Sequence, residues 1–446
     1  MSSDTNASDV LIIGGGLAGL AAATFLGRAG HRVTLLEKGK QIGGRARTQE
    51  KGGFLFNFGP HALYRHGAGV RVLRELGVPF EGKVPPLAGY AIRDGQLHAL
   101  PSEPRTMLTT SLLSLPAKWE LAKHLVTLPR LDTRSLHHTT VQQWIDQNVN
   151  HPEAREMMRA FFRLFTYADE AAVQSAGTAI EQAKRAISGN VVYLHGGWQT
   201  LVDGLRRAAE AAGVTIVQEA KVVSIERDGS ARSARLADGS FYPARAVIVA
   251  ADPHTAASLL GQEGTTSEWV KNLVPVTAAC LDLALAHLPE PRHNLAIGVD
   301  RPLYFSVHSN TARLAPEGKV LIHALKYGAE DAHADEAELE ALLDLVQPGW
   351  REQLVERRFL PKMVVANRLE TAAGGGVLGR DGPSVPSVPN LFLAGDWVGK
   401  EGLLADAALA SAKEAARQCA LFLAANPAES REEATSIYAL ASCGGK

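Results

Sequence analysis

The fold-deciding stretch runs from Asp9 to Gly19 and reads DVLIIGGGLAG. Asp9–Ile13 is a continuous apolar run, which is typical of a buried parallel strand. Leu17–Ala29 is rich in alanine and leucine and predicts a helix that Gly30 ends. Arg32–Glu37 then predicts a second strand. A strand, a glycine-rich turn, a helix and a second strand in this order predict a Rossmann-type βαβ unit that binds a dinucleotide.

The glycines of this unit have separate physical roles. Gly14 permits the tight turn, Gly16 lets the backbone approach a pyrophosphate closely, and Gly19 lets helix and strand pack together. The helix N-terminus then faces the phosphates. Glu37, at the end of the second strand, is placed to accept hydrogen bonds from the ribose hydroxyls and to repel a 2′-phosphate, which disfavours NADP. The residues of this βαβ unit that we expect to contact the dinucleotide also include Leu17, Ala18 and Lys38.

Elements of the same type recur far along the chain. Apolar strands are predicted at 246–250 and 390–394, and a long small-residue helix at 403–424. The stretch 101–188 has helical periodicity instead and predicts a helical insertion. We therefore expect an α/β fold with a discontinuous cofactor domain and an α+β substrate domain. The expected limits are 1–85, 190–255 and 365–425 for the cofactor domain, 86–189 and 256–364 for the substrate domain, and 426–446 for a C-terminal tail.

Composition excludes several classes of protein. The 446 residues carry a formal net charge of −1, with no block of Lys or Arg, so the electrostatic basis for binding nucleic acid is missing. The three cysteines, Cys280, Cys419 and Cys443, have neither the spacing of a metal site nor that of a disulfide framework. No apolar run reaches membrane-spanning length, and the polar start of the chain does not resemble a signal peptide. We expect a cytoplasmic protein without a structural metal.

A second motif, Gly43-Gly44-Arg45, follows shortly after Glu37. Together with the first motif it makes Asp9–Thr48 similar to the flavin-containing amine oxidase and phytoene desaturase superfamily, which includes protoporphyrinogen oxidase. The resemblance implies a glutathione-reductase-like FAD-binding domain. It also implies that Gly44 and Arg45 contact the pyrophosphate and flavin side of FAD.

Three further segments match the same superfamily. Phe58–His61 resembles the turn beside the flavin ring, which implies roles for Gly59, Pro60 and His61. Gly196–Val202 resembles the helix start before the adenine-contacting strand, where Val222 would hold the adenine through its backbone. The C-terminal signature implies that Asp396 binds a ribityl hydroxyl and that the following helix points at the flavin, where a positive helix end favours the reduced form. Its expected contacts are Gly395, Asp396, Leu403 and Leu404.

The resemblance implies hydride transfer from an organic substrate to flavin N5. No cysteine lies in 395–409, so FAD is expected to be non-covalent. Only Trp397 stands near the C-terminal signature, where amine oxidases of this group often carry an aromatic pair, and the segment Glu401–Ala408 looks closer to the desaturase-like branch. We therefore expect desaturation of an apolar substrate, with oxygen or a quinone-like compound as acceptor. His61 and Trp397 are the candidate residues at the flavin face.

Three alternatives stay open at this point. The first is an amine oxidase, and the second is an isomerase that uses reduced flavin without net redox, as in carotenoid isomerases and galactopyranose mutases. The third is a binding protein similar to the Rab GDP-dissociation inhibitors, which lack a functional flavin site. The presence of Glu37, Arg45 and Asp396 argues against the third.

The stretch Met107–Leu131 interleaves leucines and Trp119 with Lys118, Lys123 and Arg130. Such a pattern fits an amphipathic surface that dips into a membrane. It also fits an ordinary core-facing helix pair, which we consider the better interpretation. Pro116 and Pro129 interrupt the stretch and weaken the membrane interpretation.

Overall fold

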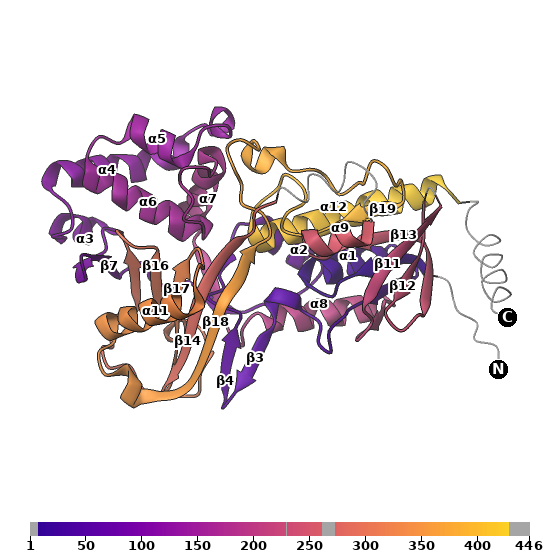
Figure 1. Cartoon of the computed structure of the whole chain (residues 1–446), viewed down its shortest axis with the longest axis horizontal. Helices are drawn as coiled ribbons and strands as arrows, with labels where there is room; N and C mark the ends of the chain where they lie inside the picture. The colour runs from indigo at the N-terminus through magenta and orange to yellow at the C-terminus, as the bar shows by residue number, and fades with distance from the viewer. Residues whose placement is uncertain (1–7, 229, 261–272, 428–446) are drawn as a thin grey trace.

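A computed structural model describes residues 8–228, 230–260 and 273–427 of the chain. Two large sheets lie toward opposite ends of the molecule, and the helices α3 to α7 form a separate group beside the second sheet (Figure 1). The strands of the first sheet come from the beginning, the middle and the end of the described chain. This is the discontinuous arrangement expected of an α/β cofactor domain, whereas the expected domain limits themselves stay a prediction.

The first sheet places four strand ends at one edge. Its order is β10-β2-β1-β13-β12-β11, with β19 paired to β13. Ile13 of β1 pairs with Leu36 of β2 and Val249 of β13, and Val249 pairs with Leu393 of β19, all in parallel. The carboxyl ends of these four strands therefore meet, as they do at ligand sites of open α/β sheets. The bounds are β1 (Ser8–Ile13), β2 (Val33–Leu36), β10 (Thr215–Val217), β11 (Val222–Asp228), β12 (Ser230–Leu236), β13 (Phe241–Val249) and β19 (Leu391–Leu393).

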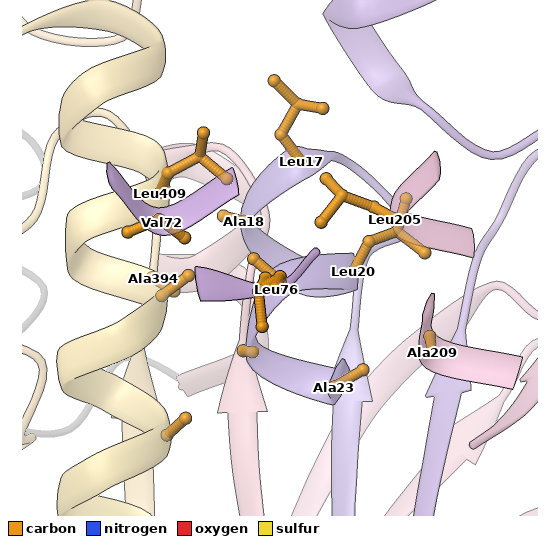
Figure 2. Packing of buried hydrophobic residues seen from close by; sticks show 14 of the residues in the cluster. Leu17, Ala18, Leu20, Ala23, Val72, Leu76, Leu205, Ala209, Ala394 and Leu409 are labelled. Carbon is orange, nitrogen blue, oxygen red and sulfur yellow. The ribbon is translucent and has the colours of Figure 1, made fainter. Parts of the chain in front are cut away.

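Helices cover both faces of this sheet. Alternate residues of β1 belong to opposite cores: Val10 and Ile12 pack with α1, and Leu11 and Ile13 pack on the side of α9. Figure 2 shows α1 between α12 and α8, with Ala18 toward α12 and Leu205 approaching from α8. Small side chains on α1 let these helices pack closely. The bounds are α1 (Leu17–Arg28), α2 (Ala68–Glu75), α8 (Gln199–Ala211), α9 (Pro253–Leu260) and α12 (Leu404–Ala425).

The second sheet has the order β18-β14-β17-β16-β15-β7-β8. Its centre is β14, which is buried almost throughout and runs antiparallel to both β17 and β18. Helix α11 (Ala332–Val346) packs on one face, and the helical group packs on the other. The strand bounds are β7 (Tyr90–Arg93), β8 (Gln96–Ala99), β14 (Val276–Leu285), β15 (Leu295–Gly298), β16 (Leu303–Val307), β17 (Val320–Tyr327) and β18 (Leu354–Ala366). The helix bounds are α3 (Pro104–Thr109), α4 (Leu115–Thr127), α5 (Val141–Asn148), α6 (Pro152–Thr166) and α7 (Ala176–Gly189).

Short strands connect the two large sheets. A hairpin of β3 (Thr48–Lys51) and β4 (Phe54–Asn57) leads from the first sheet, and β9 (Val191–Leu194) pairs with both β5 (Leu63–Tyr64) and β6 (Gly82–Lys83). The end of β4 lies against the second sheet, because Arg358 of β18 donates hydrogen bonds to the carbonyl oxygens of Phe56 and Asn57. Within the described part of the chain, no helix has the length and apolar character needed to cross a membrane.

Candidate functional site

The glycine-rich turn after β1 lies at the edge where the strand ends meet. Gly14 has a φ of +111°, and an added Cβ would lie 2.5 Å from the Ala250 carbonyl oxygen. A Cβ on Gly19 would lie 1.8 Å from the Gly14 carbonyl oxygen. A Cβ on Gly16, in contrast, would meet nothing within 4 Å. The protein itself therefore requires glycine at 14 and 19, and Gly16 borders an open cradle next to the first turn of α1.

The amides at the start of α1 face this cradle. The helix begins at Leu17, so the amides of Leu17 and Ala18 lie in its first turn and have no acceptor within the helix. Glu37 supports the turn from the end of β2, where its two carboxylate oxygens accept hydrogen bonds from the Gly15 and Gly39 amides, each at 2.7 Å. Each carboxylate oxygen has a second lone pair, so Glu37 can still accept a hydrogen bond from a ribose hydroxyl.

The second motif closes the other side of the cradle. The Gly43 amide donates to the Gly15 carbonyl at 2.7 Å, and the two segments form a parallel bridge between Gly16 and Gly43. Gly43 and Gly44 both have positive φ, and a Cβ on Gly44 would lie 3.6 Å from the Gly16 Cα. The two glycine motifs therefore face each other. The resemblance implied this arrangement, but the spacing of the motifs in the sequence could not show it.

An ion pair joins the N-terminal and C-terminal motifs. Arg45 Nη2 lies 2.7 Å from Asp396 Oδ1, and Arg45 also donates to the Val365 carbonyl at 3.0 Å. Asp396 is 4% exposed, and its two carboxylate oxygens accept hydrogen bonds from the backbone amide and the side chain of Asn367 at 3.0 and 2.8 Å. Burial acts to raise the pKa of Asp396, but the charge and hydrogen bond of Arg45 and the Asn367 amides together lower it. Asp396 is therefore an anion that is held in place.

The N-terminus of α12 lies beside Asp396. Leu403 caps the helix, and Leu404 has a φ of +55°, which is strained for a leucine. Both residues line a small cavity together with Asp396. Gly395 is fixed by Ser411, whose hydroxyl accepts from the Gly395 amide at 3.0 Å and donates to its carbonyl at 2.8 Å. Sequence reasoning did not predict Asn367 or Ser411, because their partners come from segments distant in sequence.

The turn Gly59-Pro60-His61 packs against the second sheet. A Cβ on Gly59 would lie 2.6 Å from Met363 Cε of β18. His61 donates through Nδ1 to the Gly59 carbonyl at 3.0 Å and lies edge-on to Trp198, with ring centroids 4.8 Å apart. Burial is the main cause that lowers the pKa of His61 to about 4. His61 is therefore a neutral hydrogen-bonding group at neutral pH.

A buried polar cluster behind this turn was not predicted from the sequence. It contains Cys280 and Asp282 of β14, His323 of β17, Arg358 of β18 and His308. Asp282 is fully buried and accepts hydrogen bonds from Cys280 Sγ at 3.1 Å, His323 Nδ1 at 2.5 Å and Arg358 Nε at 3.0 Å. An aspartate within the apolar run Ala278–Ala286 was the signal that could have located it, since a buried charge requires a partner.

The cluster does not fit a metal site well. Cys280, Asp282 and His323 have ligand atoms within 4.8 Å of one another. The Arg358 guanidinium, however, already neutralises Asp282, and burial raises the pKa of the Cys280 thiol well above its ordinary value, which favours the neutral thiol. A bound cation would therefore lie next to a fixed positive charge, so we treat the cluster as structural.

Five tyrosine side chains lie near one another. Tyr167, Tyr304 and Tyr327 contribute to the core between the helical group and the second sheet, whereas Tyr64 lies on β5 and Tyr193 on β9. Tyr193 and Tyr304 lie with their hydroxyl oxygens 3.4 Å apart, and Tyr64 donates to the Phe165 carbonyl at 3.3 Å. Burial raises the pKa of all five members, so they are neutral phenols. The members are Tyr64, Tyr167, Tyr193, Tyr304 and Tyr327.

Two of the expected site residues need comment. Trp397 is 1% exposed, packs in the core beside Val249 and Leu393, and donates through Nε1 to the Ala251 carbonyl at 3.1 Å. Its expected place at the flavin face stays a prediction. Val222 begins β11 and is half-buried, and its expected adenine contact stays a prediction.

The arrangement fits a flavin dinucleotide. The open position at Gly16, the free amides of α1 and the carboxylate of Glu37 suit a pyrophosphate and a ribose. Arg45 and Asp396 continue the same edge toward the N-terminus of α12. A single extended ligand can therefore touch both glycine motifs and the C-terminal signature.

Comparison with known proteins agrees with this geometry. The profile of the family described as flavin containing amine oxidoreductase matches residues 17–420. A stretch of 58 residues is 52% identical to the carotenoid 3,4-desaturase of Haloarcula japonica and covers 13% of this chain and 12% of that protein. A stretch of 85 residues is 40% identical to the L-amino-acid oxidase of Crotalus adamanteus and covers 19% and 16%, respectively. The matched stretches are thus a small part of these relatives.

A solved structure supports the same assignment at the level of the fold. An oxidoreductase from Methanosarcina mazei superposes with a TM-score of 0.73 at 20% identity, over 91% of this chain and 98% of that one. This likeness confirms the predicted α/β fold class, and the family profile, which spans most of the chain, confirms the resemblance stated from the motifs. The chain therefore belongs to the flavin-containing amine oxidoreductase family.

Proposed function

We propose that the chain binds FAD non-covalently along the cradle. The two glycine motifs and the α1 amides would hold the pyrophosphate, Glu37 would hold the adenosine ribose, and Val222 would contact the adenine. Asp396 would accept a hydrogen bond from a ribityl hydroxyl, and this bond would replace part of its contact with Arg45. The observation that carries this proposal is the open position at Gly16, where a Cβ would meet nothing within 4 Å although both neighbouring glycines of the motif are tightly packed.

We further propose that the substrate is an apolar organic molecule that is dehydrogenated at carbon. FAD supplies the hydride acceptor when it is bound. The five neutral tyrosines behind the Gly59–His61 turn give this region hydrogen-bonding groups without charge, which suits an uncharged substrate better than a cation. The sequence supports the same choice, because the segment Glu401–Ala408 carries no aromatic side chain that could form a wall around an amine.

His61 would orient the substrate rather than take its proton. Its Nδ1 is committed to the Gly59 carbonyl, and its pKa of about 4 makes the ring a weak base at neutral pH. The electron acceptor is proposed to be oxygen or a quinone-like compound. Amine oxidation is the second candidate, and the stretch similar to an L-amino-acid oxidase favours it.

An anaerobic absorbance titration tests these proposals. The purified, flavin-loaded protein is mixed with panels of isoprenoid polyenes, porphyrinogens and amines, and bleaching of the oxidised flavin band is followed. We expect bleaching by a polyene and none by the amines. Bleaching by amines alone would establish the second candidate, and turnover of a polyene without consumption of any acceptor would indicate an isomerase. A protein that shows no flavin band even after addition of FAD would overturn the cofactor assignment.

A further inference from the structure

A patch of large apolar side chains lies exposed on the helical group. It consists of Leu108 on α3 and of Leu115, Trp119 and Val126 on α4, and we call it the α4 patch. These side chains are 75%, 70%, 79% and 64% exposed, respectively. Single exposed apolar residues are common, but four large ones on adjacent helices form a contiguous feature of the kind that marks an interaction surface.

Helix α4 is apolar on two opposite faces. Leu115, Trp119 and Val126 follow the helical repeat and form one stripe toward solvent. Ala117, Leu121 and His124 form the other face and are buried. The expected core-facing helix therefore describes one face of α4, and the exposed stripe is a second apolar face that the core contacts do not use.

Basic side chains surround the exposed stripe. At about 100° per residue, Lys118 and Lys123 project on either side of it, roughly 60–80° from its centre. Lys118 Nζ donates to the Leu108 carbonyl at 2.9 Å, and Arg130 Nη1 donates to the Val126 carbonyl at 3.1 Å, which places both cations next to the patch. Among the described residues, none of these three cations takes part in an ion pair.

The nearby carboxylate of Glu120 is directed away from the stripe. One of its oxygens accepts from the backbone and side chain of Asn150 at 2.7 and 2.9 Å, and the other accepts from the His151 amide at 2.7 Å. Burial acts to raise the pKa of Glu120, but these hydrogen bonds together lower it, so Glu120 is an anion whose oxygens already accept hydrogen bonds from the protein. The charge available to a partner of the α4 patch is therefore positive.

An anionic lipid surface matches these features better than a second copy of the chain. An antiparallel contact between two α4 helices would bring Lys118 and Lys123 of each copy together, which is unfavourable. Four side chains are also few compared with the roughly 20–30 residues per side of a stable interface. A tryptophan with flanking leucines and lysines on one helix face is the pattern of an interfacial anchor. Figure 1 shows α3 and α4 at the end of the molecule opposite β11 and β12, where they can approach a flat surface.

We propose that the α4 patch docks the protein onto the surface of a lipid bilayer that carries anionic headgroups. Leu108, Leu115, Trp119 and Val126 enter the interfacial region, and Lys118, Lys123 and Arg130 contact the headgroups. This surface is separate from the flavin cradle, and it goes beyond the proposed function. If that function holds, the same contact brings the enzyme to the phase in which apolar substrates dissolve.

Vesicle flotation with the flavin-loaded full chain tests the proposal in the absence of any substrate. Vesicles of phosphatidylcholine are compared with vesicles that also contain phosphatidylglycerol. We expect the protein to float with the phosphatidylglycerol vesicles and to be released progressively by salt, since salt screens the lysine contacts. The flavin absorbance of each fraction reports that the protein stays folded and loaded.

Variants identify the surface. Leu115→Ser combined with Trp119→Ser is expected to lower the partition coefficient by about tenfold or more, because two large apolar groups no longer leave water. Lys118→Gln combined with Lys123→Gln is expected to lower binding to phosphatidylglycerol vesicles by roughly fivefold per charge and to weaken its salt dependence. Leu421→Ser is the matched control, because Leu421 is 57% exposed on α12 at the other end of the molecule, and it should bind as the parent protein does.

Three outcomes would overturn the proposal. The first is a parent protein that floats with neither kind of vesicle. The second is a Leu115→Ser/Trp119→Ser variant that floats as well as the Leu421→Ser control. The third is a concentration-dependent dimer, seen by light scattering, that the patch variant abolishes, because this would assign the α4 patch to a second copy of the chain. None of these outcomes depends on the identity of the substrate, so failure of the proposed function would be seen separately in the flavin titration.

Discussion

At the scale of single residues, Glu37 and Asp396 perform structural tasks in addition to their proposed contacts with FAD. Glu37 holds the Gly15 and Gly39 amides, and Asp396 pairs with Arg45. We predict that Glu37→Ala and Asp396→Ala each weaken FAD binding by at least about tenfold, as expected when a hydrogen bond to a charged group is lost, and therefore lower FAD occupancy. The ratio of flavin to protein absorbance measures this. Full flavin retention in both variants would refute the site assignment, and Glu210→Ala at the exposed end of α8 serves as a control.

A second prediction at this scale concerns His308. Its ring is 1% exposed, is stacked on Tyr193 at 3.8 Å, and has no hydrogen-bond partner for either nitrogen among the described residues. Burial lowers the pKa of His308 well below its ordinary value of 6.5. On acidification the unfolded chain therefore takes up this proton first, so the free energy of unfolding decreases as the pH falls below about 6.5.

Replacing this imidazole with an uncharged ring should weaken the pH dependence. We predict that His308→Phe loses less stability than the parent protein between about pH 7.5 and about pH 5.5. His61, whose pKa is also lowered, keeps part of the effect in both proteins. Urea unfolding at the two pH values measures the difference. An equal decrease in both proteins would show that His308 does not titrate in this range.

At the scale of elements, the strand–turn–helix unit separates two uses of glycine. Gly19→Ala would put a Cβ 1.8 Å from the Gly14 carbonyl oxygen, so α1 must shift away from β1. Gly16 has φ of −78° and ψ of −175°, which alanine adopts readily, and its Cβ would meet no protein atom within 4 Å. We predict that Gly16→Ala keeps the melting temperature of the flavin-free protein but no longer binds FAD. Gly19→Ala, in contrast, is expected to lower both the melting temperature and the affinity for FAD.

Thermal melting of the flavin-free proteins, followed by FAD titration, distinguishes these outcomes. A Gly16→Ala variant that binds FAD as tightly as the parent protein would contradict the position of the cradle. A stable Gly19→Ala variant would contradict the close contact of α1 with the preceding turn.

The elements differ in how far their sequence determines them. The apolar runs of β1 and β14 and the small residues of α12 predict those elements directly, because burial on all sides leaves a continuous pattern. The strand β18 is half-exposed and contains Arg357 and Arg358, so its sequence has no continuous apolar run, and its full length depends on pairing with β14. Helix α11 was missed although Asp331 caps it and its leucines follow a helical repeat.

The residues of the candidate site also differ in how far the sequence predicts them. Motif residues such as Glu37 and Asp396 could be located from the sequence, because each follows a predicted strand of the first sheet. Asn367, Ser411 and the cluster around Asp282 could not, because their partners are brought together only by packing between distant segments. The core packing of Trp397 could not be predicted for a related reason, since proximity in sequence to Asp396 does not show which side of the sheet a side chain occupies.

At the scale of the whole molecule, one guanidinium links the second sheet to the β3–β4 hairpin. Arg358 of β18 pairs with Asp282 of β14 and also donates to the Phe56 and Asn57 carbonyls at the end of β4. The Asn57 side chain in turn accepts from the Trp198 amide at the start of α8, at 3.0 Å. Burial acts to raise the pKa of Asp282, but His323 and Arg358 lower it, so the carboxylate is an anion inside the protein.

Removing only Arg358 should therefore destabilise the protein more than removing the charges of both Arg358 and Asp282. We predict that Arg358→Met lowers the free energy of unfolding by about 3–5 kcal/mol, because Asp282 keeps a buried charge without its counter-ion. In the Asp282→Asn/Arg358→Met double variant no unpaired charge remains and the asparagine still accepts from His323, so the loss should be smaller than in Arg358→Met alone. Urea unfolding followed by tryptophan fluorescence measures both variants. If the double variant is as unstable as the sum of the two single variants, the pair is not coupled, and the carbonyl contacts of Arg358 alone connect the second sheet to β4.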